Sequence, residues 1–407
     1  MKRYCLILVL PLIFFCSCAK IPFVRSGAKV QTGLDIMVQE DFARLADKRV
    51  GLISNHSALD SSGKNILDLM LGSANVRLQA IFAPEHGFQG TAEEQIKDTT
   101  DAKSGLVIYS LYSEAKRPTK EQMKNIDVFV FDIQDIGARF YTYIATLAMC
   151  MEEAANNTIP FIVLDRPNPI TGLRVDGPIQ DKDLYLKFTS YFPMPIIHGM
   201  TIGEVAKMFN EYYGIQCDLT VVQMKGWKRK MFFDETGLPW VNPSPNIRSV
   251  TQEILYPAIA LAEASDSNVS VGRGTDTPFE VFGAPFINAE QMALELNSRG
   301  LPGVQFLPYD FIPNANKFKD EQCHGCQIIL TDRSVFDPIG TGLNLVSALY
   351  KLYPETYQID PNVGLIGSKD VIQRIKQGEA VPEIRASYQK DLNLFIKIRN
   401  DFLLYKE

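Results

Sequence analysis

The chain has 407 residues, which is long for a single hydrophobic core and favours two domains. Its hydrophobic content of 46% and its charged content of 22% are typical of a globular protein. The formal net charge of -6 argues against a nucleic-acid-binding protein, which usually presents a basic face, so we expect no nucleic-acid partner.

The amino terminus is typical of an export signal. Lys2 and Arg3 precede an apolar stretch that ends at Phe15 and is too short to span a bilayer. The following Cys16-Ser17-Cys18 resembles a loose bacterial lipobox, which predicts a signal peptide over 1–17, diacylation of Cys18 and a tether over 18–30. The alternative is a plain signal peptide with an incidental cysteine. We therefore expect an exported lipoprotein, anchored by lipid in the membrane and facing the periplasm or the cell surface.

After the tether, apolar runs alternate with helical patterns. In chain order we expect a helix over 37–48, a strand over 50–53, a helix over 63–71, strands over 78–83 and 106–109, a helix over 119–125, a strand over 127–131, a helix over 138–156 and a strand over 160–164. Continuous apolar strands between helices predict an α/β domain, over 31–195, built on a parallel sheet with both faces covered.

The second half predicts a smaller C-terminal α/β domain over 196–407. Thr201 and Glu204 have the spacing of a capping box, so a helix should follow as far as Tyr213. A strand is expected over 219–222, and helices over 289–298, 342–352 and 386–404. The prolines between Tyr191 and His198 place the boundary there.

Polar clusters follow four of the predicted strands. They are 54–56 (SNH), 84–87 (PEHG), 132–139 (DIQDIGAR) and 165–169 (DRPNP). Open α/β sheets bind ligands beyond the carboxyl ends of their strands, so acids, imidazoles, amides and arginines at this edge indicate an enzyme.

Glu85 beside His86 is the strongest candidate pair, with Glu85 as a general acid. Its structural alternative is a capping or ion-pair role in a tight turn. Asp132 and Asp135 are each a candidate base or hydroxyl anchor, although Asp135 could instead cap the following helix. Asp165 and Asn168 lie in a proline-stiffened loop that suits hydrogen bonding to a ligand, or that only satisfies local backbone.

Other polar features are weaker. Arg273 lies between Gly272 and Gly274, a pattern suited to holding an anion and equally compatible with a surface turn. A zinc site from His56, His86 and Asp132 is conceivable, but the sequence has no paired metal-ligand motif. The CxxC at 323–326 leads into a strand rather than a helix, so we expect a structural role, with an adventitious disulfide as the further option.

Five strings together resemble the exo-β-N-acetylmuramidases of the NamZ type, a family once known only as a domain of unknown function. They are GLISNH at 51–56, PEHGF at 84–88, DIQDIGARFYTY at 132–143, LDRPNP at 164–169 and SVGRGT at 270–275. The resemblance covers roughly residues 30–405. It implies a Rossmann-like domain followed by a smaller α/β domain, with the active cleft between them. Some members have a glutamate where this chain has Val271, so a catalytic role for that position is not carried over.

The resemblance also implies release of N-acetylmuramic acid from the non-reducing ends of peptidoglycan fragments. The glutamate of the PEHG string carries over as the catalytic Glu85. The second group would be Asp132, Asp135 or Asp165, or the 2-acetamido oxygen of the substrate. A cation should read the lactyl carboxylate, for which Arg139, Arg166 and Arg273 are candidates. No metal or organic cofactor is required.

The candidate catalytic residues are therefore Glu85, Asp135 and Asp165. The candidate substrate-binding residues are the other polar groups of the rim and the glycine-rich loop: Asn55, His56, His86, Asp132, Gln134, Arg139, Tyr141, Arg166, Asn168 and Arg273. Two other functions stay open: a non-catalytic lipoprotein that captures cell-wall sugars, and a metal-dependent hydrolase that uses His56 and His86.

Overall fold

The computed structural model of the chain describes residues 29–92, 97–112, 116–264 and 266–405. The predicted signal peptide 1–17, the lipidation site Cys18 and nearly all of the tether lie outside these residues. In the described part, no helix has the length and apolar character needed to cross a bilayer.

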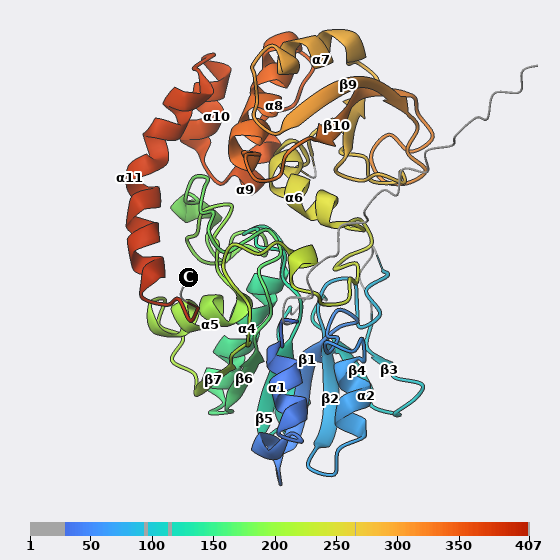
Figure 1. Ribbon diagram of the computed structural model, residues 1–407, viewed down its shortest axis with the longest axis vertical. Coiled ribbons are helices and arrows are strands. Elements are labelled where there is room, and N and C mark those ends of the chain that lie inside the picture. The colour runs from blue at the N-terminus through green and yellow to red at the C-terminus, as the bar shows by residue number, and fades with distance from the viewer. Residues whose placement is uncertain (1–28, 93–96, 113–115, 265, 406–407) are drawn as a thin grey trace, which may run out of the picture.

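The first domain is built on a seven-stranded sheet in the order β3-β4-β2-β1-β5-β6-β7 (Figure 1). All neighbouring strands pair in parallel except β3, which runs antiparallel to β4. The strands are β1 Arg49–Ser54, β2 Arg77–Ala83, β3 Thr99–Thr100, β4 Val107–Ser110, β5 Val128–Asp132, β6 Phe161–Leu164 and β7 Leu219–Val222. Every residue of β5 and β6 is buried, as expected for central strands covered on both faces, so the predicted α/β fold is confirmed.

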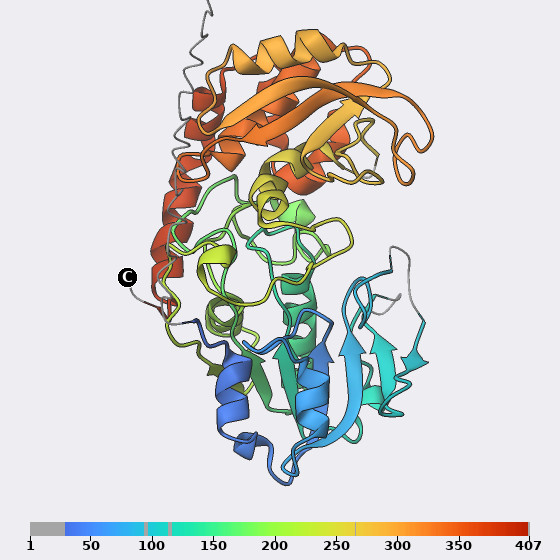
Figure 2. The same cartoon turned by 45° about the vertical axis from the view of Figure 1, so that its right-hand side comes forward.

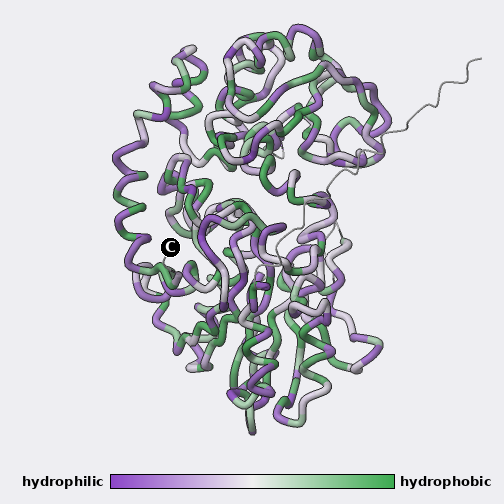
Figure 3. Tube along the Cα trace, viewed as in Figure 1, coloured by the Kyte–Doolittle hydropathy of each residue, from purple (hydrophilic) through white to green (hydrophobic). Residues whose placement is uncertain are grey.

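Helices cover the two faces of this sheet because alternate strand residues point in opposite directions. Val128 and Val130 of β5 pack with the helices α1 Gly33–Gln39 and α2 Ile66–Leu71. Phe129 and Phe131 belong to the larger core on the other face, with α4 Tyr143–Asn156 and α5 Ile202–Glu211. The short helix α3 Lys120–Met123 precedes β5. Figure 3 shows the strands as the most hydrophobic part of this domain.

The predicted capping box at the start of α5 is confirmed. Thr201 Oγ1 accepts the backbone N–H of Glu204 at 3.3 Å, and the Glu204 carboxylate accepts the N–H of Thr201 at 3.0 Å. After α5 the chain enters β7, which pairs with β6 through Leu219 opposite Phe161. The sheet thus takes its last strand from beyond residue 195, where we expected the domain to end. The sequence marks β7 as a strand but does not say which sheet it joins.

The second domain contains a three-stranded antiparallel sheet in the order β8-β10-β9. Its elements are α6 Val250–Ile259, β8 Val281–Ala284, α7 Ala289–Asn297, β9 Val304–Phe311, β10 Cys323–Leu330, α8 Pro338–Leu352, α9 Val363–Ile366, α10 Lys369–Lys376 and α11 Val381–Asn400. The long helix α11 runs along one side of the molecule from this domain back to α5, as Figures 1 and 2 both show.

The CxxC motif lies within β10, and both of its thiols are buried and free. Residues three apart in a strand point to opposite faces, and Cys323 and Cys326 accordingly pack into separate apolar clusters. A disulfide between them, the further option from sequence, is therefore excluded by the strand geometry.

Candidate active site

A cavity of about 770 Å³ opens between the two domains. The first domain contributes residues that follow β2 and β4 and residues that precede α4; the second contributes the segment after α6 and the glycine-rich loop around Arg273. The charged and imidazole groups among the described residues that line it are Glu85, His86, Lys116, Glu263, Asp266, Arg273 and Lys317. The carboxyl edge of the parallel sheet therefore forms one wall, as its topology predicts.

Glu85 follows β2 and is half-buried at this wall. Thr142 Oγ1 donates a hydrogen bond to Glu85 Oε2 at 2.5 Å. The Tyr112 hydroxyl lies near Glu85, and burial together with this carboxylate raises the pKa of Tyr112 to about 12. The Thr142 hydroxyl thus fixes the orientation of the Glu85 carboxyl group, with Tyr112 beside it.

Thr142 is the N-cap residue of α4, yet its side chain makes no capping hydrogen bond. Threonine at this position normally accepts an N–H from the first turn of the helix. Thr142 instead has helical backbone angles, with φ of -71° and ψ of -10°, and its hydroxyl is hydrogen-bonded to Glu85.

His86 lines the cavity beside Glu85, in a left-handed conformation with φ of 69°. Its Nδ1 lies 2.7 Å from the carbonyl oxygen of Ala92, which fixes the ring within the loop. His56 packs against this loop. The Nε2 atom of His56 lies 2.6 Å from the carbonyl oxygen of Asn242, and burial lowers the pKa of the His56 ring. The ring of His56 fills the space next to Gly90, where an added Cβ would lie 1.8 Å from Cε1.

Asp132 and Arg166 form a buried ion pair rather than part of the cavity wall. Arg166 Nη2 donates to Asp132 Oδ2 at 2.9 Å, Nε donates to Oδ1, and Nη2 also reaches the carbonyl of Leu59. In the described chain no three histidine, cysteine or acidic side chains are grouped to hold a metal ion. Because Asp132 is paired with Arg166, the side chains of His56, His86 and Asp132 do not form the zinc site considered from sequence.

Asp165 also lies outside the cavity. Its carboxylate accepts hydrogen bonds from the hydroxyls of Thr201 and Tyr405 and from the N–H of Gly203, and burial raises its pKa to about 7. Tyr405 comes from the end of the chain, so Asp165 anchors that segment to the sheet rather than facing a ligand.

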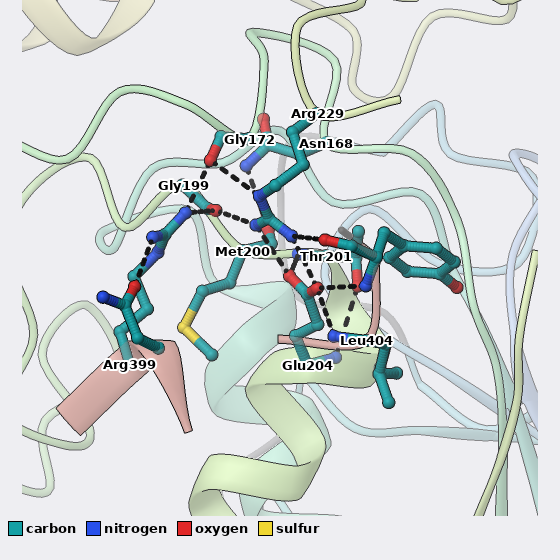
Figure 4. A network of polar contacts seen from close by, with 12 residues as sticks. Asn168, Gly172, Gly199, Met200, Thr201, Glu204, Arg229, Arg399 and Leu404 are labelled. Atoms are coloured by element: carbon teal, nitrogen blue, oxygen red, sulfur yellow. Dashed lines mark hydrogen bonds and ion pairs between the residues drawn. The ribbon is translucent and has the colours of Figure 1, made fainter. Parts of the chain in front are cut away.

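Asn168 belongs to the same buried region (Figure 4). Its Nδ2 donates to the carbonyl of Met200, and nearby the Glu204 carboxylate pairs with Arg229 through a 2.7 Å contact. Arg399, which lies in the last turn of α11, donates to backbone carbonyls of this network, including that of His198. These contacts join the C-terminal segment to the first domain.

The remaining rim candidates make hydrogen bonds inside the fold, and only Asp135 Oδ1 and Arg139 Nε among their described side-chain atoms are buried without a hydrogen-bond partner. Gln134 donates to the carbonyls of Asp135 and Pro167, and Asn55 donates to the Tyr143 hydroxyl. Asp135 accepts the N–H of Gly137 and lies 3.6 Å from the buried His198. Arg139 is buried and donates to the carbonyls of Pro178, Met194 and Leu365.

Of the residues singled out from sequence, the cavity brings together Glu85, His86, Tyr141 and Arg273. Nine are placed elsewhere: Asn55, His56, Asp132, Gln134, Asp135, Arg139, Asp165, Arg166 and Asn168. The strand-end argument pointed to the edge of the sheet that lines the cavity, but it could not distinguish side chains that face the cavity from those that turn back into the loops.

Sequence reasoning missed several groups that line the cavity. Tyr112 and Lys116 follow β4, so the rule applied to the other strand ends would have found them. Thr142 lies inside the DIQDIGARFYTY string, where its neighbours Tyr141 and Tyr143 are the more conspicuous side chains. Glu263 and Lys317 carry no pattern that marks them in the sequence.

The fold and the cavity define a two-domain α/β protein that presents a carboxyl group at the edge of its parallel sheet. The chain belongs to the exo-β-N-acetylmuramidase NamZ family: the model of the N-terminal domain of that family matches residues 50–251, and the model of the C-terminal domain matches residues 254–405.

Individual relatives agree with this assignment. The peptidoglycan β-N-acetylmuramidase NamZ of Bacillus subtilis (strain 168) is 44% identical over 382 residues, which cover 93% of this chain and 92% of the relative. Two crystal structures of DUF1343 family proteins from Bacteroides fragilis NCTC 9343 have the same fold. One has a TM-score of 0.86 at 36% identity and the other 0.77 at 32%; each alignment covers 93% of this chain, with 99% and 100% of the respective structure.

Proposed function

We propose that this protein is an exo-acting glycoside hydrolase that releases N-acetylmuramic acid from the non-reducing ends of peptidoglycan fragments. Membership of the exo-β-N-acetylmuramidase family supports the reaction class. The observation that carries the proposal for the site is Glu85, held by Thr142 at the wall of the cavity.

In this proposal Glu85 is the general acid. Its carboxyl proton passes to the glycosidic oxygen as the bond from that oxygen to the anomeric carbon breaks. The resulting Glu85 carboxylate then accepts a proton from the water that completes hydrolysis. Thr142 keeps the carboxyl group in place through both steps, because it donates a hydrogen bond to Glu85.

For the second group we propose the 2-acetamido oxygen of the substrate. None of Asp132, Asp135 and Asp165, the protein alternatives from sequence, lines the cavity, and Asp132 and Asp165 are bound by other residues of the fold. Glu263 lines the cavity, but both of its oxygens bind Arg273. Attack by the acetamido oxygen on the anomeric carbon, followed by water, gives net retention. Nuclear magnetic resonance of the first product should show the β anomer, and an initial α anomer would instead require a protein base.

We further propose that the mature protein is exported and held at the membrane by lipid on Cys18. The lipobox-like Phe15-Cys16-Ser17-Cys18 after an apolar stretch supports this. Metabolic labelling with a fatty-acid analogue should label the intact chain and not Cys18→Ala, whereas equal labelling of both would exclude Cys18 as the acceptor.

The deciding experiment for the activity compares the wild type with Glu85→Gln. A defined muramic acid–glucosamine disaccharide is incubated with each, and released N-acetylmuramic acid is detected by mass. We expect release by the wild type and a loss of at least about 1,000-fold in the variant, because the amide cannot donate the proton. Binding of the disaccharide without release by the wild type would support the sugar-capturing alternative, and full activity of the variant would reject Glu85 as the acid.

A further inference from the structure

The lining of the cavity contains three cationic side chains in the described part of the chain: Lys116, Arg273 and Lys317. Arginines 139 and 166, the other cations considered from sequence, are buried among backbone carbonyls and against Asp132. A cation that binds an anionic substituent of the substrate is therefore expected among these three side chains.

On the side of the second domain, the cations are offset by carboxylates. Arg273 binds both oxygens of Glu263, and its guanidinium lies 5.0 Å from the ring centroid of Phe279. Lys317 Nζ donates to the carbonyl of Ala264 at 2.7 Å and to Ser267 Oγ at 3.0 Å. Glu263 and Asp266 also act on Lys317 electrostatically, so two positive charges face two negative ones.

On the side of the first domain, Lys116 is held differently. Its Nζ lies 4.7 Å from the ring centroid of Phe188, and it makes no ion pair with any residue that the structure describes. Phe188 in turn packs against Tyr112, with ring centroids 5.9 Å apart, and both rings line the cavity together with Glu85. The ammonium group and the acid thus belong to the same wall of the cavity.

We propose that Lys116 is the specificity-determining residue that binds the lactyl carboxylate of the muramic acid ring. This inference rests on the proposed function. N-Acetylmuramic acid differs from N-acetylglucosamine by a lactyl ether that carries a carboxylate, and this ether lies on the same ring as the bond to be cleaved. The Phe188 ring supports the ammonium group by a cation–π contact and leaves N–H donors for the carboxylate.

The backbone at Lys116 is consistent with a dedicated position. Its φ of 51° places it in the left-handed region, which non-glycine residues adopt at a cost and which concentrates at functional sites. Lys116 is half-buried, so a carboxylate bound there is partly shielded from water and the ion pair gains strength.

The test compares two ligands of nearly the same shape: N-acetylmuramic acid and its lactyl amide, which lacks the charge. Their affinities are measured by calorimetry for the wild type, Lys116→Met and Lys116→Arg. Lys120→Met, at the exposed first position of α3 and outside the cavity, is the matched control. The kcat/KM values for chromogenic glycosides of the same two sugars give a second readout.

We expect the wild type to prefer the acid over the amide, and Lys116→Met to weaken binding of the acid by about 10- to 100-fold while leaving the amide unchanged. Lys116→Arg should restore most of the preference, and Lys120→Met should match the wild type. An equal loss for both ligands, or an unchanged preference in Lys116→Met, would overturn the proposal. If the wild type prefers the acid through Lys116 but hydrolyses neither glycoside, the proposed activity fails and the binding role of Lys116 stands.

Discussion

The buried ion pair between Asp132 and Arg166 offers a direct test of how the strand-end residues divide between structure and binding. The two side chains are 0% and 4% exposed, and two parallel contacts join them. Asp132→Asn removes the negative charge and leaves the guanidinium of Arg166 buried against one amide oxygen and the carbonyl of Leu59. Breaking a buried pair in this way costs about 3–5 kcal/mol, because the remaining charge has neither water nor a counter-ion.

Urea denaturation followed by tryptophan fluorescence measures this cost. With an m value of about 3 kcal/mol/M or more for a chain of this size, the unfolding midpoint should fall by about 1 M. The activity of the folded fraction should stay close to that of the wild type. The double variant Asp132→Asn/Arg166→Met should recover part of the loss, since it leaves no unpaired charge.

Glu85→Gln serves as a control with the opposite expected outcome. Because Glu85 is half-buried at the cavity, its replacement should abolish activity and leave the urea unfolding midpoint unchanged. The reasoning would be refuted if Asp132→Asn kept the wild-type midpoint and raised KM for the muramic acid glycoside. That result would place Asp132 in contact with substrate, as the sequence alone suggested.

Three further predictions concern the supports of the site. Thr142→Val removes a hydrogen bond to Glu85 and should lower kcat about 10-fold and displace the pH profile of kcat/KM. Thr142→Ser should restore both properties, and the urea midpoint should be the same in all three proteins. Gly90→Ala, at φ of 69° and against the ring of His56, should cost about 1–3 kcal/mol in urea unfolding; a wild-type midpoint would contradict the close packing. Burial raises the pKa of Asp165 to about 7 in the folded state. Between about pH 4 and 7 the folded state therefore keeps a proton on Asp165 that the unfolded state has released, and the stability contributed by this group falls as pH rises through that range. Asp165→Asn should flatten that dependence in urea titrations, and an unchanged slope would show that other groups cause it.

The sheet and its edge could be predicted from sequence because they depend on local patterns. The run Phe161–Leu164 is short, rich in aromatic and β-branched residues and preceded by Pro160, which favours a buried strand over a helix. The carboxyl edge of a parallel sheet then gathers the loop residues at the end of each strand, which located Glu85 and His86 correctly at the cavity.

The division of roles within that edge could not be predicted, because it depends on contacts across the fold. Asp165 is held by Tyr405, which lies 240 positions later in the chain, and Arg139 donates to the carbonyl of Leu365. Leu365 lies in α9 of the second domain, and Tyr405 follows α11, the helix that returns to the first domain. Asp165 and Arg139, whose side chains could bind a ligand in another fold, therefore hold the two domains together here.

Some residues of the cavity lining adopt backbone conformations that cost free energy. Four non-glycine residues of its lining have left-handed backbone conformations: His86, Lys116, Phe279 and Asn316. Each such conformation costs about 1–3 kcal/mol and persists only where surrounding packing enforces it. Nine other described non-glycine residues with such conformations lie outside the cavity lining, so backbone strain alone does not mark a site. At His86 and Lys116 the strain points to function because both side chains line the cavity that holds Glu85.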